Sequence, residues 1–153
     1  MLIEVYDIET LSNLFTYTGF DVTNKQWYQF VISRWRNDAS LLYSHLFRDT
    51  IYHVGFNNEN FDYPVIHHFI NHYNEYQYLD GQELAQKLYD KSQDIINQEF
   101  ATISDKNKFI RQIDLFRIWH YNNAARSTSL KDLEIVMQMD NVEEMPIHHT
   151  QWC

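Results

Sequence analysis

The sequence has a single cysteine and no long apolar run. Because that cysteine is Cys153, a disulfide framework within the chain is excluded, as is a structural zinc site built from cysteines. A reducing compartment such as the cytoplasm is expected. The short N-terminal apolar run is broken by Glu4, Asp7 and Glu9, so no secretory signal is expected. No stretch has the length of a membrane-spanning helix, so no membrane partner is expected.

Positive charge is also scarce. The chain has 12 Lys and Arg against 21 Asp and Glu, and its formal net charge is −9 with histidine neutral. Autonomous nucleic-acid-binding domains are usually basic, so the composition argues against one. It is compatible with a metal site that acts on phosphates, because bound ions supply positive charge locally.

Apolar and aromatic residues are abundant. A hydrophobic content of 44% in 153 residues supports one domain with a substantial core. Eleven Tyr, ten Phe and four Trp predict many half-buried rings. The chain contains no internal repeat and no low-complexity tract.

The hydrophobic pattern predicts an α/β domain. Strands are expected at residues 2–8, 14–20, 27–32, 51–56 and 109–115, the first three as an antiparallel meander. Helices are expected at residues 38–47, about 60–73, 81–97 and 129–139, with Asp38 capping the first. Strands joined by helical crossovers should run parallel to their neighbours, which gives a mixed five-stranded sheet with helices on both faces.

Two carboxylates, Asp7 and Glu9, are expected at the end of the first strand. Alternate residues of a strand share a face, so both side chains should point the same way as Ile3 and Val5. Two like charges beside an apolar stripe repel each other, and a divalent cation between them removes that cost. Carboxylate oxygens suit Mg²⁺ or Mn²⁺. The simpler alternative is a strand whose polar end reaches solvent.

A third carboxylate, Asp62, follows the fourth expected strand and opens the next helix. If that strand lies beside the first, the two carboxyl ends share a sheet edge, where ligands bind in open α/β sheets. The alternative is that Asn60 caps the helix and Asp62 only complements its dipole.

These segments carry a family resemblance. Tyr6-Asp7-Ile8-Glu9-Thr10 and Asn57-x-x-x-Phe61-Asp62, about fifty residues apart, resemble the first two motifs of DEDD-type (DnaQ-like) 3′–5′ exonucleases. The nearest resemblance is to the proofreading domain of family-B DNA polymerases, phage versions in particular. Ile113–Leu115 and Ser129–Leu133 are similar to the family's later strand and helix, so the resemblance covers nearly the whole chain.

The resemblance implies an RNase H-like domain that uses Mg²⁺ or Mn²⁺ to hydrolyse the 3′ ends of single-stranded DNA. By position, Asp7, Glu9 and Asp62 would be the catalytic metal ligands. Asp7 would contact both ions of a two-metal site, Glu9 would bind one and face the attacking water, and Asp62 would hold the second through water.

The same resemblance assigns substrate binding to Leu11, Asn57 and Phe61. Phe61 or Leu11 would pack against the terminal base, a contact that tolerates any base. Asp114 is expected to lie behind the metal ligands or to be a strand-end residue without a catalytic role.

The family's fourth carboxylate, in Tyr-x-x-x-Asp or His-x-x-x-x-Asp on a later helix, has no match, since no Asp follows Asp140. Tyr17 to Asp21 and Tyr76 to Asp80 have the first spacing but precede the fifth strand. Residues 1–153 are therefore expected to be a C-terminally incomplete exonuclease-like domain.

Other origins of the missing carboxylate stay open. A polymerase domain or a second chain could supply it, or catalysis could be lost. The alternative function is a catalytically silent nucleic-acid- or protein-binding domain with the same fold, and a weaker one is an exonuclease acting on short RNA.

Histidine pairs are further candidates. His68 and His72 have the i, i+4 spacing of a zinc site, although partly exposed helix residues are the favoured interpretation. His148 and His149 are a candidate acid or base near the carboxylate edge. The mildly basic second half of the chain is interpreted as a solvated face.

Overall fold

The computed structural model describes residues 2–48, 51–98 and 101–119. A five-stranded sheet in the order β3-β2-β1-β4-β5 forms its centre. The strands are β1 (Leu2–Leu11), β2 (Leu14–Asp21), β3 (Gln26–Ser33), β4 (Ile51–Gly55) and β5 (Arg111–Asp114).

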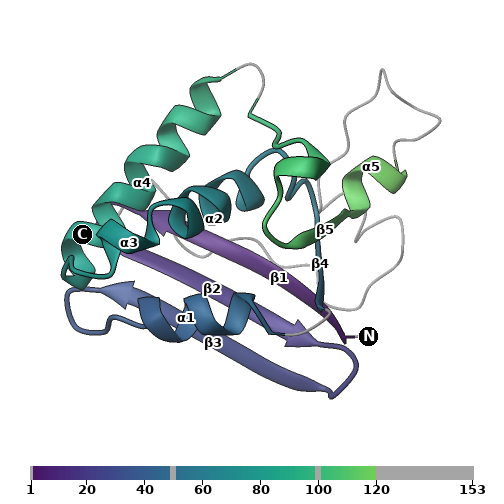
Figure 1. Ribbon diagram of the computed structural model, residues 1–153, viewed down its shortest axis with the longest axis horizontal. Coiled ribbons are helices and arrows are strands. Elements are labelled where there is room, and N and C mark those ends of the chain that lie inside the picture. The colour runs from purple at the N-terminus through teal and green to yellow at the C-terminus, as the bar shows by residue number, and fades with distance from the viewer. Residues whose placement is uncertain (1, 49–50, 99–100, 120–153) are drawn as a thin grey trace, which may run out of the picture.

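The strands are paired as the sequence predicts. β1, β2 and β3 form an antiparallel meander, whereas β4 runs parallel to β1 and β5 runs parallel to β4. Figure 1 shows β1 between β2 and β4, at the point where the pairing changes direction. The α/β class and the mixed sheet are therefore confirmed, and the strand order is consistent with RNase H-like topology.

Strand ends differ from the prediction in two places. β1 does not end at residue 8, because Thr10 and Leu11 pair with Phe15 and Leu14 across a two-residue hairpin loop. Asp7 and Glu9 therefore lie inside the strand. β5 starts at Arg111, and the last residue of the expected strand already begins a helix.

The helices agree with the prediction where they are long. They are α1 (Ala39–Leu46), α2 (Asp62–Asn71), α3 (Tyr73–Tyr76), α4 (Gly81–Asn97), a 3₁₀ turn η1 (Asp105–Asn107) and α5 (Leu115–Trp119). α4 has the predicted bounds, whereas α3, η1 and α5 are too short to give a periodic signal. The helix expected at 129–139 lies outside the described residues.

Two capping predictions are wrong in detail. Asp38 is the N-cap residue of α1, but its carboxylate accepts a hydrogen bond from the Val31 N–H at 2.9 Å and pairs with Arg36 at 2.6 Å. The N-cap residue of α2 is Phe61 and not Asn60. By contrast, Asp80 caps α4 through the Glu83 N–H at 2.8 Å.

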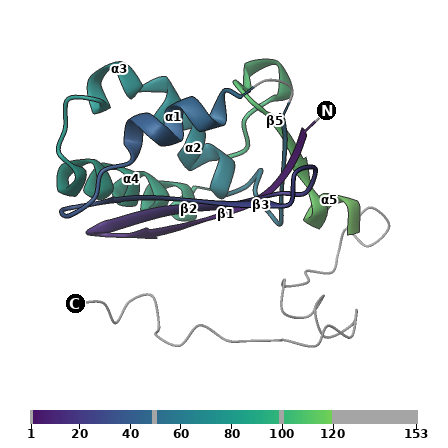
Figure 2. The same ribbon diagram turned by 90° about the horizontal axis from the view of Figure 1, so that it is seen from below.

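Helices α1 to α4 lie on one face of the sheet (Figure 2). α5 follows β5 directly, and its first residue, Leu115, borders the opposite face. Across residues 2–48, 51–98 and 101–119, no helix combines the length and the apolarity that crossing a bilayer requires.

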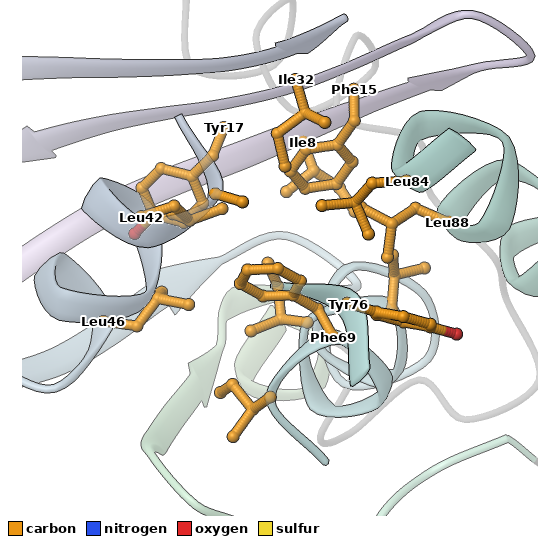
Figure 3. Packing of buried hydrophobic residues seen from close by; sticks show 14 of the residues in the cluster. Ile8, Phe15, Tyr17, Ile32, Leu42, Leu46, Phe69, Tyr76, Leu84 and Leu88 are labelled. Carbon is orange, nitrogen blue, oxygen red and sulfur yellow. The ribbon is translucent and has the colours of Figure 1, made fainter. Parts of the chain in front are cut away.

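The hydrophobic core lies between the sheet and these helices (Figure 3). Each large apolar side chain buried there contributes about 1.5–3 kcal/mol relative to exposure. Fully buried members include Phe15, Tyr17, Ile32, Leu42, Phe69, Leu84 and Leu88.

A buried carboxylate, Glu4 of β1, lies in this core between the sheet and the helices. It accepts hydrogen bonds from the Tyr17 hydroxyl, from Arg48 and from His45 Nε2, the last at 2.9 Å. Burial alone would raise the pKa of Glu4, but the bonds from His45 and Tyr17 outweigh burial and lower it. A Cβ at Gly19 would collide with this carboxylate, so the neighbouring strand has to carry glycine there.

Replacing Glu4 should destabilise the fold. Glu4→Gln leaves Arg48 without its counter-charge and weakens the hydrogen bonds from His45 and Tyr17, and we expect a loss of about 3–5 kcal/mol in the free energy of unfolding. Because the pKa of Glu4 is lowered in the folded state, its contribution is lost as pH falls through that value, and the variant should lose less stability in acid. Urea unfolding at pH 7 and pH 3 measures both effects.

The control is Glu75→Gln, an exposed acid on α3, which should change stability by less than about 0.5 kcal/mol. Equal unfolding midpoints for Glu4→Gln and the wild type would contradict the role given to Glu4.

Candidate active site

Asp7 and Asp62 meet at an unpaired edge of the central strand. β4 pairs with β1 only as far as Val5, although β1 continues to Leu11. α2 begins beside this edge, and its first residue is Asp62. The carboxyl group of Asp62 contacts that of Asp7 and accepts a hydrogen bond from the backbone N–H of Ile8. The sequence pattern predicted that these two carboxylates lie at one sheet edge, and in the structure they are in contact.

The pair is electrostatically costly. Asp62 is only 7% exposed, and burial together with the charge of Asp7 raises its pKa to about 8. Burial also raises the pKa of Asp7, partly offset by the hydrogen bond from Asp62. The two groups therefore share a proton near neutral pH, and a divalent cation could take the place of that proton.

Glu9 lies on the same exposed face of β1 as Asp7. Both residues line a pocket of about 700 Å³ on the side of the sheet opposite α1 to α4, together with Val5. Asp7, Glu9 and Val5 share a face of β1, as expected, but this face is not covered by helices α1 to α4. The core side of β1 carries Tyr6 and Ile8 instead.

The carboxylates at this edge do not form a complete metal site. In the three described ranges, no set of three or more His, Cys, Asp or Glu side chains is arranged to hold a metal ion. The carboxylate chemistry suits a hard cation at Asp7 and Asp62, with Glu9 on the adjoining wall, but these residues do not close a three-ligand site.

The predicted substrate residues occupy different surroundings. Leu11 is buried, and Phe61 packs against the hydrophobic core. Asn57 has a left-handed backbone, with φ of 56°, and its side-chain oxygen accepts a hydrogen bond from Asn60 at 2.7 Å. None of the three is among the residues that line the pocket beside Asp7 and Glu9.

Asp114 holds the loop that leads to Asp62. One of its oxygens accepts from the N–H groups of Asn57 at 2.8 Å and Phe116 at 2.9 Å, and the other accepts from the Glu59 N–H at 3.2 Å. Its charge also helps to raise the pKa of Asp62. Asp114 therefore lies behind the carboxylate pair and positions the β4–α2 loop.

Sequence reasoning missed the charge cluster on this loop. Glu59 is 5% exposed and pairs with Lys108 and, at 2.5 Å, with Arg117. The signal was weak, because these residues lie about fifty positions apart and their pairing depends on β5 lying beside β4.

The paired histidines take part in local packing. His68 Nε2 lies 2.7 Å from the Tyr76 hydroxyl, and the His72 ring bonds to the His68 carbonyl at 3.0 Å. Burial, together with His72, lowers the pKa of His68 to about 4. His148 and His149 lie outside the described residues.

Comparison of the chain with models of known families, with curated proteins and with solved structures found no significant match. The geometry alone therefore defines the class, an α/β domain with RNase H-like strand order. A carboxylate pair lies at the free edge of its central strand.

Removing the Asp114 carboxylate should loosen the loop. Asp114→Ala leaves three backbone N–H groups without an acceptor, and we expect a loss of about 3 kcal/mol in stability. Hydrogen exchange should accelerate at residues 57–59 more than in α4. An equal increase in exchange in residues 57–59 and in α4 would contradict the role of Asp114 in holding the β4–α2 loop.

Asp62→Asn should stabilise the metal-free protein at alkaline pH. Because the folded-state pKa of Asp62 is raised to about 8, its favourable contribution is lost as pH rises toward that value. Urea unfolding in EDTA should show a gain of about 1–3 kcal/mol for the variant at pH 8.5, narrowing by pH 5. A difference that does not vary with pH would show that the two carboxyls do not repel each other.

Proposed function

We propose that this protein is a metal-dependent 3′–5′ exonuclease that hydrolyses phosphodiester bonds at single-stranded DNA 3′ ends, as a proofreading-type module or part of one. The observation that carries the proposal is the contact between Asp7 of β1 and Asp62 of α2. Perturbed carboxyls that converge from separate elements are typical of functional sites.

In this proposal Asp7 and Asp62 hold Mg²⁺ or Mn²⁺, and Glu9 orients the attacking water from the wall of the adjoining pocket. A bound divalent cation would neutralise charge on the scissile phosphate and activate water. Asp114 keeps the β4–α2 loop in place, so that Asp62 stays against the free edge of β1.

A partner belongs to the proposal. The described residues close no three-ligand set, so a further carboxylate would come from a polymerase domain or a second chain. The DNA strand would be held by that partner as well, because this chain carries a net charge of −9.

The absence of a three-ligand set among the described residues also favours one alternative, a catalytically silent binding domain that retains the fold. In that case the Asp7–Asp62 pair stays protonated and holds no ion.

Nuclease activity tests the proposal. A 5′-labelled single-stranded oligonucleotide should be shortened from its 3′ end by the full chain, assayed with any polymerase domain that follows it, only when Mg²⁺ or Mn²⁺ is present. Asp7→Asn and Asp62→Asn should each reduce the rate by roughly 100-fold or more, because each removes a metal ligand. Asp90→Asn, an exposed acid on α4, is the control and should keep the full rate.

Calorimetric titration with Mn²⁺ separates the two functions. Binding that is lost in Asp7→Asn supports the nuclease, whereas no binding in the wild type supports the silent domain. Degradation that survives both substitutions would overturn the site assignment.

A further inference from the structure

A second pocket, of about 400 Å³, borders α2, α4 and the segment 101–103 on the side of the sheet that the helices cover. Figure 1 shows α2 and α4 side by side. Three imidazoles and one ammonium group line this pocket, and no Asp or Glu lines it among the described residues. We call it the histidine–lysine pocket, after His67, His68, His72 and Lys91. It has the size of a small-molecule site.

Lys91 brings a permanent charge to this pocket. Its side chain is half-buried and forms no ion pair with any described residue, although Asp94 follows three positions later on α4. A partly desolvated charge without a counter-ion is unfavourable, and an anion bound beside it removes that cost.

The electrostatic field of the pocket is positive. Burial, His72 and Lys91 together lower the pKa of His68 to about 4, and Asp94 opposes them. Burial and then Lys91 also lower the pKa of His67. The cationic groups therefore outweigh Asp94 at His68, and an anion that binds there gains free energy.

Each of the three histidines keeps one ring nitrogen available. His67 Nδ1 lies 3.1 Å from the Tyr63 hydroxyl, and His68 Nε2 lies 2.7 Å from the Tyr76 hydroxyl. His72 Nδ1 donates to the His68 carbonyl at 3.0 Å. The second nitrogen of each ring makes no hydrogen bond with a described residue, so it can take up a proton and donate to an anion.

The chemistry of the lining favours a phosphate group. A phosphate offers several acceptor oxygens and up to two charges, which suits converging imidazoles, the Lys91 ammonium and the amides of Asn71 and Gln98. A divalent metal ion fits less well, because Lys91 repels it and no described carboxylate lines the pocket.

We propose that the histidine–lysine pocket binds a phosphate group, as free phosphate or as a small phosphomonoester. Lys91 supplies the permanent charge, and at least one imidazole takes up a proton as the anion binds. The site is independent of the proposed nuclease function, since none of its described lining residues lines the pocket beside Asp7 and Glu9.

A phosphate titration of the full chain at pH 7 and constant ionic strength, followed by NMR of the histidine side chains, tests the site. Inorganic phosphate at millimolar concentration should shift the imidazole signals of His68 and His72 saturably. Lys91→Gln should weaken binding by about 10-fold or more, because it removes a charged donor. Lys91→Arg should retain binding.

Lys87→Gln is the matched control. It removes the same charge from an exposed position one turn earlier on α4, outside the pocket lining, and should leave the affinity unchanged. Lys91→Gln should also leave metal-dependent hydrolysis unchanged, and Asp62→Asn should leave phosphate binding unchanged. Failure of this site and failure of the nuclease proposal are thereby distinguishable.

The source of the phosphate group is separated by a second ligand. Thymidine 5′-monophosphate that binds more tightly than inorganic phosphate would identify a phosphomonoester site, whereas equal affinities would identify a site for free phosphate. Thymidine without phosphate should cause no shift in either case.

Four results would overturn the proposal. The wild type could show no saturable shift with phosphate, or Lys91→Gln could bind phosphate as tightly as the wild type. Zn²⁺ could shift His68 and His72 while phosphate does not, which would indicate a metal site. A dT oligonucleotide without a terminal phosphate could bind there more tightly than inorganic phosphate, which would indicate a nucleic-acid surface.

Discussion

The difference in length between β1 and β4 shapes the candidate site. β4 stops pairing at Val54, opposite Val5, while β1 continues to Leu11 along its other neighbour. Backbone N–H groups on the unpaired stretch need acceptors, because a buried donor without one is costly. The carboxyl of Asp62 meets this need at Ile8 and is thereby brought against Asp7. One edge of one strand thus positions α2 and creates the carboxylate pair.

Two buried carboxyls of this protein behave in opposite ways. Glu4 is surrounded by donors, from Tyr17, His45 and Arg48, and its pKa is lowered. Asp62 faces another acid, and its pKa is raised to about 8. The hydrogen bonds to Glu4 stabilise the folded chain with no bound ion. The repulsion between Asp62 and Asp7 is removed only when the pair binds a proton or a cation. This contrast is the physical reason for placing the candidate site at Asp62 and not at Glu4.

Much of the fold follows from local sequence. α4 could be predicted with its ends because residues 81–97 carry a long amphipathic pattern, and the structure adds that Asp80 caps it. The meander and the meeting of Asp7 with Asp62 followed from strand alternation and from parallel crossovers. The added length of β1 could not be predicted in this way, because it depends on pairing with Leu14 and Phe15 across the hairpin.

The contacts and burial of individual side chains were harder to predict from the sequence. The acceptor role of Asp114 requires the β4–α2 loop to reach the end of β5, a contact between segments far apart in the chain. Likewise, nothing local indicates that Leu11 is buried or that Phe61 turns toward the core. The metal and substrate roles of the site residues remain predictions.

Gly19 and Glu4 are not independent positions. The glycine leaves the space that the carboxylate occupies, and any side chain at position 19 would displace it from Tyr17, His45 and Arg48. A larger residue at position 19 is therefore accommodated only together with a smaller residue at position 4. Among sequences that share this sheet, the two sites should vary as a pair, with a larger residue on β2 accompanied by a smaller, uncharged one on β1.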